Sequence, residues 1–143
     1  MKAALFDTNI LIDAISGYPE AFAEFGCWQR TAISAITLIE LYAGVALKDK
    51  QEIASVLASV GFEIIQIDAT IINIAARIRS ASVRRRAKIA LPDAIILATA
   101  QARSLVVVTR NKKDFKGPNI RVPYELETVT TTRIINIRPP PLL

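Results

Sequence analysis

Histidine is absent from this sequence of 143 residues, and cysteine occurs once, at Cys27. Without histidine, neither a Ser-His-Asp triad nor a Cys-His pair can form, which excludes nucleophilic catalysis of these two kinds. A single thiol cannot form an internal disulfide or supply a cysteine cluster for a metal. If the protein binds a metal ion, carboxylates are therefore its expected ligands.

Long apolar runs are also missing. No stretch approaches the roughly 18 apolar residues that a membrane-spanning helix needs. Asp7 interrupts the N-terminal apolar run before it reaches the length of a signal-peptide core. We therefore expect a cytoplasmic protein that does not associate with membranes.

Apolar residues nevertheless make up 52% of the chain, which is high for a soluble monomer. Such an excess indicates that another chain covers part of the apolar surface, so we expect an oligomer or a tight protein partner. The length is typical of a single domain.

The net charge is +5, which favours binding to polyanions. Part of this charge is concentrated between positions 77 and 88, where no acid occurs. The basic residues there are Arg77, Arg79, Arg84, Arg85, Arg86 and Lys88. The run is either the solvated face of a helix or a surface that contacts nucleic acid. Because no aromatic residues for base stacking are interleaved with it, such contact would be to the nucleic-acid backbone.

The N-terminal stretch MKAALFDTNILID combines a strand, an acid and a helix start. Met1 to Phe6 is long enough for a buried strand, and Asp7 follows at once, with Thr8 and Asn9 able to cap the helical run from Ile10. Open α/β sheets bind their ligands outside the carboxyl ends of the strands, where Asp7 would lie. The alternative role for Asp7 is that of a helix N-cap.

The same order of apolar run, polar residue and helix recurs along the chain, which predicts an α/β fold with a mostly parallel sheet. The expected strands are residues 1–6, 31–36, 62–67, 105–109 and 119–122. The expected helices are residues 10–16, 21–28, a helix that a capping box starts at Thr37 and that passes Gly44, residues 48–60, a helix capped by Asp68 that ends in the basic run, and residues 91–103. We expect a domain at 1–127 and an extended or disordered tail at 128–143.

Besides Asp7, three acids stand near predicted strand or helix ends: Glu40, Asp93 and Asp114. Each can be a residue that only terminates a helix, as we expect for Asp68. If strands one, two and four are neighbours, however, their acids converge, and like charges about 4 Å apart cost on the order of 4 kcal/mol per pair. A magnesium or manganese ion would compensate this repulsion.

Four stretches in this order, FDTNILID, ISAITLIELYAG, KIALPDAIILATA and VVVTRNKKDF, resemble a PIN-domain ribonuclease of the VapC toxin type. The resemblance runs from Lys2 to Glu125. It implies an α/β/α sandwich, RNA cleavage that depends on Mg²⁺ or Mn²⁺, inhibition by a cognate antitoxin protein, and a homodimer.

The same resemblance assigns the site residues. The first three family acids fall on Asp7, Glu40 and Asp93, all three candidates for binding the metal, although Glu40 could instead orient the attacking water. The fourth position falls on Asn111 or Asp114. Supporting polar groups are Thr8, Asn9 and Thr109, and the candidates for contact with the RNA backbone are Arg84, Arg85, Arg86 and Lys88.

These residue types suit hydrolysis of a phosphodiester without histidine, because one or two metal ions can activate water and neutralise phosphate charge. A phosphatase of the haloacid dehalogenase type also starts with a strand that ends in aspartate, but it needs a second aspartate where this chain has Asn9. The remaining alternative is a catalytically inactive PIN-like module that binds RNA or regulates another protein.

Overall fold

The computed structural model describes residues 2–44, 50–128 and 131–141. Its central sheet contains β1 (Ala3–Phe6), β2 (Arg30–Ser34), β3 (Glu63–Ile65), β4 (Val106–Val108) and β5 (Ile120–Arg121). The strands lie in the order β3-β2-β1-β4-β5, and each neighbouring pair is parallel. The predicted parallel α/β sheet is therefore confirmed.

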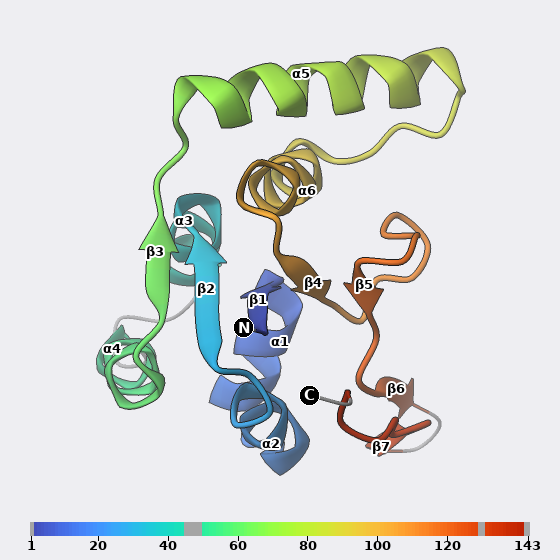
Figure 1. Cartoon of the computed structure of the whole chain (residues 1–143). Helices are drawn as coiled ribbons and strands as arrows, with labels where there is room; N and C mark the ends of the chain where they lie inside the picture. Colours follow the sequence, from blue (N-terminus) through green and yellow to red (C-terminus); the bar gives the residue numbers. More distant parts are fainter. Residues whose placement is uncertain (1, 45–49, 129–130, 142–143) are drawn as a thin grey trace.

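Helices cover both faces of this sheet, as Figure 1 shows. They are α1 (Thr8–Ile15), α2 (Pro19–Phe25), α3 (Ala35–Gly44), α4 (Lys50–Val60), α5 (Ala69–Arg84) and α6 (Leu91–Arg103). Residues of α1, α2, α3 and α4 share one core cluster, whereas α5 and α6 pack into a second cluster. The architecture is an α/β/α sandwich.

The short strands supply both cores by alternation. Phe6 and Val108 belong to the cluster beneath α1 and α2, while Leu5 and Val107 belong to the cluster beneath α5 and α6. All four side chains are almost fully buried. A parallel sheet buried on both faces requires nearly continuous apolar strands, which explains the runs seen in the sequence.

The order in which successive strands are added to the sheet reverses between β1 and β4. From β1 the chain proceeds to β2 and β3 on one side, and it returns to β4 and β5 on the other. The backbone N–H of Asp7 donates to the carbonyl of Val108 at 2.9 Å, so the two strands stay paired up to their carboxyl ends. In open α/β sheets the crevice at such a reversal is the usual ligand site.

Two predicted element boundaries differ from the structure at the second strand. The strand was expected to end at Ile36 but ends at Ser34, and the helix after it begins earlier than expected. The expected capping box would start a helix at Thr37, but α3 begins at Ala35, and the Ser34 hydroxyl accepts a hydrogen bond from the Ile36 N–H at 3.2 Å. Serine at the strand end therefore starts the helix two residues early. Of the predicted helix 48–60, positions 48 and 49 lie outside the described residues.

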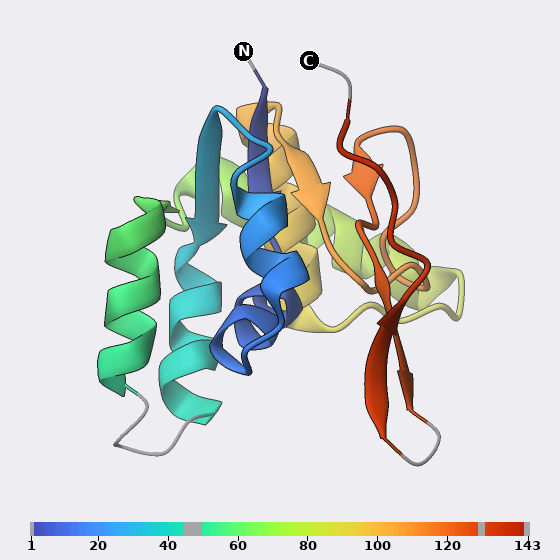
Figure 2. The same ribbon diagram turned by 90° about the horizontal axis from the view of Figure 1, so that it is seen from below.

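The C-terminal segment contains a hairpin where a tail was expected. β6 (Glu125–Thr128) pairs antiparallel with β7 (Thr132–Ile135), and the hairpin extends away from the sandwich in Figure 2. The β-branched run Thr132 to Ile135 has the composition of a strand. Positions 129–130 and 142–143 of the expected tail lie outside the described residues.

Among the helices of the described ranges, none has both the length and the apolar content needed to span a bilayer.

Candidate functional site

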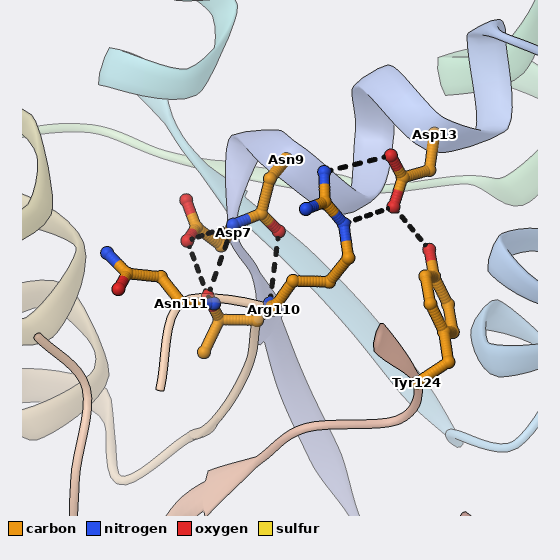
Figure 3. A network of polar contacts seen from close by, with 7 residues as sticks. Asp7, Asn9, Asp13, Arg110, Asn111 and Tyr124 are labelled. Carbon is orange, nitrogen blue, oxygen red and sulfur yellow. Dashed lines mark hydrogen bonds and ion pairs between the residues drawn. The ribbon is translucent and has the colours of Figure 1, made fainter. Parts of the chain in front are cut away.

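Asp7 stands at the N-cap position of α1, but its side chain does not cap the helix. Its Oδ2 instead accepts hydrogen bonds from the Thr109 hydroxyl at 2.7 Å and from the Asn9 amide at 3.0 Å. Figure 3 shows these contacts between the start of α1 and the turn after β4. Burial raises the pKa of Asp7, and the hydrogen bond from Thr109 opposes this rise. Asp68 differs because its carboxylate accepts the Ile71 N–H of α5 at 2.9 Å.

Glu40 lies on α3 and contacts the first residue of α1. The Thr8 hydroxyl donates to Glu40 Oε1 at 2.7 Å and is also hydrogen-bonded to the Thr37 hydroxyl at 3.0 Å. Thr8 and Thr37 are both buried. The first residue of α1 therefore holds the acid of α3 in place, and Thr37 belongs to the site rather than to a helix cap.

Asp93 lies in the first turn of α6 and is only partly buried. Burial, together with the negative charges of Asp7, Asp114 and Glu40, raises its pKa to about 6. These four carboxylates come from four separate segments of the chain. Within the described residues, none of them forms an ion pair with a lysine or arginine.

The two candidates for the fourth position share one turn after β4. The Asn111 amide donates to Asp114 Oδ2 at 3.1 Å, and the Asp114 N–H donates to Asn111 Oδ1 at 3.2 Å. The Asn111 N–H donates to the Thr109 hydroxyl at 2.9 Å, which links the turn to the Asp7 contacts. Asp114 contributes the charge that acts on Asp93, and Asn111 holds Asp114.

The donor chemistry of this cluster fits a hard divalent cation, because an excess of carboxylates faces no compensating ion pair. Across the described ranges, no three or more acidic or other metal-binding side chains already surround one common point. Magnesium in proteins usually keeps several waters and is bound through one or two carboxylates.

A buried network beside the acids was not predicted. The Arg110 guanidinium donates to both carboxylate oxygens of Asp13, at 2.6 and 3.0 Å, and the Tyr124 hydroxyl donates to Asp13 Oδ2 at 2.7 Å. The Arg110 N–H also donates to Asn9 Oδ1 at 3.3 Å, as Figure 3 shows. The only sequence feature that could have indicated this network was an acid, Asp13, within the apolar helical run of α1.

The residues predicted to contact RNA differ in whether they line a cavity. α5 ends at Arg84, whose guanidinium donates to the Ser80 hydroxyl at 3.0 Å. Arg85 lines a cavity beside Asp114, whereas Arg84, Arg86 and Lys88 are not among the residues that line it.

Comparisons with known proteins identify the family of the chain. The model of the PIN domain family matches residues 4–118. The chain is 31% identical to Toxin FitB from Neisseria gonorrhoeae, over 82% of this chain and 94% of the relative. It is 32% identical to the tRNA(fMet)-specific endonuclease VapC from Salmonella typhimurium, over 85% of this chain and 97% of the relative.

A solved toxin-antitoxin complex from Klebsiella pneumoniae contains a chain with the same fold. Its TM-score is 0.72 at 45% identity, and the match covers 85% of this chain and 98% of that chain. The DNA-bound VapBC complex from Salmonella typhimurium gives a TM-score of 0.71 at 30% identity, with 85% and 96% covered.

Proposed function

The chain belongs to the PIN-domain family, among its VapC-type members, and on this basis we propose that it is a metal-dependent endoribonuclease and the toxin of a type II toxin-antitoxin system. The observation that carries the proposal is that the negative charges of Asp7, Asp114 and Glu40, together with burial, raise the pKa of Asp93, while hydrogen bonds hold Asp7 and Glu40 against the start of α1 and the turn after β4. This arrangement occurs at the edge of the sheet where the strand order reverses. Two relatives are named endonucleases, which supports nuclease activity.

Asp7, Glu40 and Asp93 are the residues that would hold Mg²⁺ or Mn²⁺, with Asp114 or Asn111 completing the set. A bound divalent ion would lower the pKa of an attacking water and neutralise charge on the phosphoryl oxygens. The chain itself keeps the ligands in place. Thr109 and Asn9 fix one oxygen of Asp7, and Thr8 fixes one oxygen of Glu40.

Hydrogen bonds to the charged form of a carboxylate favour ionisation. The Thr109 hydroxyl therefore offsets part of the burial that would otherwise keep Asp7 protonated. This matters because a carboxylate must be deprotonated to bind a metal. Thr8, Asn9 and Thr109 are accordingly positioning residues.

The substrate is RNA in this proposal. The relatives from Salmonella typhimurium and Shigella flexneri are named tRNA(fMet)-specific endonucleases, which makes tRNA(fMet) the first substrate to assay. An excess of basic residues over acids, 18 against 13, favours such a polyanion.

The partners in this proposal are a cognate antitoxin and a second copy of the chain, both in the cytoplasm. Large apolar side chains are exposed on both sides of the sheet. Ile12, Ile39 and Tyr42 lie on α1 and α3, and Ile72 and Val83 lie on α5. Exposed apolar groups at several places support burial against other proteins. Light scattering of the purified chain, alone and with its antitoxin, tests both assemblies.

Cleavage of tRNA(fMet) by the purified chain tests the function. We expect cleavage with Mg²⁺ or Mn²⁺, none with EDTA, and none by Asp93→Asn with either metal. Asp68→Asn is the matched control, because Asp68 caps α5 away from the cluster and should leave cleavage intact. A wild-type chain that binds RNA but cleaves neither tRNA(fMet) nor mixed cellular RNA would indicate the inactive PIN-like module.

A further inference from the structure

A concave region lies beside Asp114 of the acid cluster. It is a cavity of about 660 Å³ between the C-terminal half of α5, the start of the turn after it, α6 and the turn after β4. Its polar lining includes Arg77, Arg85, Lys113, Lys116 and Asp114. Its volume lies in the usual range for a ligand site of roughly 300–1,000 Å³.

Within the described residues, the four basic residues of this cavity lack acidic partners, as do Arg79, Arg84, Arg86 and Lys88 in the run outside it. In the described part of the chain, Arg77, Arg85, Lys113 and Lys116 have no carboxylate within ion-pair distance. Other nearby basic residues are paired: Arg110 with Asp13, Lys112 with Glu125 and Arg103 with Asp68. The cavity therefore gathers four cations against a single acid, Asp114, and none of the four forms an ion pair among the described residues.

The turn that presents Arg85 is defined by hydrogen bonds. Ser82 is buried, its carbonyl accepts the Ala87 N–H at 2.9 Å, and its hydroxyl accepts the Ile89 N–H at 3.1 Å. Arg86 adopts the left-handed conformation, with φ of 56°, which turns the chain after α5. The turn thus places Arg85 in the cavity, whereas neither Arg84 nor Arg86 lines it.

Asp114 connects the cavity to the acid cluster, because it lines the cavity and its charge also acts on Asp93. A strand of RNA with one phosphate at the acids would therefore have a neighbouring phosphate within reach of the four cations. Arginine and lysine bind phosphate through charge-assisted hydrogen bonds.

We propose that this cavity is a phosphate subsite for the RNA substrate, in which Arg77, Arg85, Lys113 and Lys116 hold a phosphodiester next to the one that is cleaved. The inference rests on the proposed ribonuclease function. It assigns backbone recognition to Arg85 and not to Arg84 or Arg86, and it adds Arg77, Lys113 and Lys116.

RNA binding without cleavage tests the subsite. The reference is the full chain carrying Asp93→Asn, in EDTA, and the probe is a fluorescent single-stranded RNA of about 12 nucleotides. Arg85→Gln, Arg84→Gln and Arg86→Gln are then added one at a time. These three arginines are consecutive and carry the same charge, so each variant removes the same net charge at almost the same place.

We expect Arg85→Gln to weaken binding about tenfold and to lower the slope of log affinity against log salt by about 0.7, the loss of one phosphate contact. Arg84→Gln and Arg86→Gln should change affinity less than about twofold. Lys113→Gln should likewise weaken binding more than Lys112→Gln, because Lys112 already pairs with Glu125. Arg85→Lys should restore part of the affinity, and melting curves verify that every variant folds.

Equal weakening by all three arginine variants would overturn the subsite and assign the effect to general charge. Unchanged affinity in Arg85→Gln, or no binding of this RNA by the reference, would overturn it as well. Each of these results leaves the proposed function standing if the wild type cleaves RNA with Mn²⁺, since binding and cleavage are measured separately.

Discussion

The guanidinium of Arg110 lies against the buried carboxylate of Asp13, with Nε 2.6 Å from Oδ2. Arg110 follows β4 and Asp13 lies on α1, so the pair joins α1 to the turn after β4. Since the Arg110 N–H also donates to Asn9, the turn that carries Thr109 and Asn111 is fixed against the segment that carries Asp7. The acid cluster depends on a neighbouring ion pair that itself contributes no group to it.

Asp13→Ala should destabilise the fold by about 3 kcal/mol, because it leaves a largely buried guanidinium without its partner. It also removes the acceptor of the Tyr124 hydroxyl. Urea denaturation at neutral pH measures the change. Glu63→Ala breaks the exposed pair with Arg30, whose side chains are 47% and 53% accessible, and should cost less than about 1 kcal/mol. Equal costs for the two variants would mean that the Asp13 pair does not support the fold.

In the metal-free chain, the contribution of Asp93 to the free energy of unfolding should fall as the pH rises from about 4 to about 7. The pKa of Asp93 is about 6 in the folded chain against an ordinary value of 3.8, so in this window the folded state binds more protons than the unfolded state. More protons bound in the folded state means that its stability decreases with pH.

Urea denaturation of wild type and Asp93→Asn in EDTA, across this pH range, measures that contribution. The variant should gain stability relative to wild type as the pH rises. Asp68→Asn, which removes a carboxylate outside the cluster, should not show the same gain. A pH dependence unchanged by Asp93→Asn would show that neither burial nor the other acids raise the pKa of Asp93.

Thr109→Val should shift the acidic limb of the cleavage profile to higher pH. The substitution conserves shape but removes the hydroxyl that donates to Asp7, so the pKa of Asp7 should rise. More alkaline conditions are then needed to ionise Asp7 for metal binding. The measurement is the initial rate of RNA cleavage against pH at fixed Mn²⁺.

Thr99→Val is the matched control for this shift. Thr99 is equally buried, but its hydroxyl donates to the Ile95 carbonyl within α6. Its removal should leave the profile in place. A profile that moves to the same extent in both variants would assign the effect to packing rather than to Asp7.

Sequence patterns located the acids but left the strand order open, so their convergence was expected only if strands one, two and four are neighbours, as they are in the structure. Asp7 follows an apolar run and Asp93 follows Pro92 at a helix start, so local signals located both residues. The parallel pairing of β1 with both β2 and β4 then placed them at one edge of the sheet.

The network around Asp13 could not be predicted in the same way. Its members lie 97 and 111 positions apart in the sequence, Asp13 to Arg110 and Asp13 to Tyr124, and no local pattern specifies which charges pair at that distance. The capping pattern at Thr37 was misleading for a related reason. A threonine and a glutamate one helical turn apart suit a capping box, yet tertiary contacts with Thr8 use both side chains in the site.

The central claim, that the acids form a metal site, is tested most directly by melting wild type, Asp7→Asn and Asp68→Asn in EDTA and in saturating Mn²⁺. Binding to the folded state raises stability by about 2.7 kcal/mol at a metal concentration of 100 times Kd. We predict that Mn²⁺ raises the melting temperature of wild type and of Asp68→Asn but hardly that of Asp7→Asn. In EDTA, Asp7→Asn should melt at or above the temperature of wild type, because it removes a buried charge that other acids repel. An Asp7→Asn chain that melts clearly below wild type in EDTA and gains as much from Mn²⁺ would contradict the account.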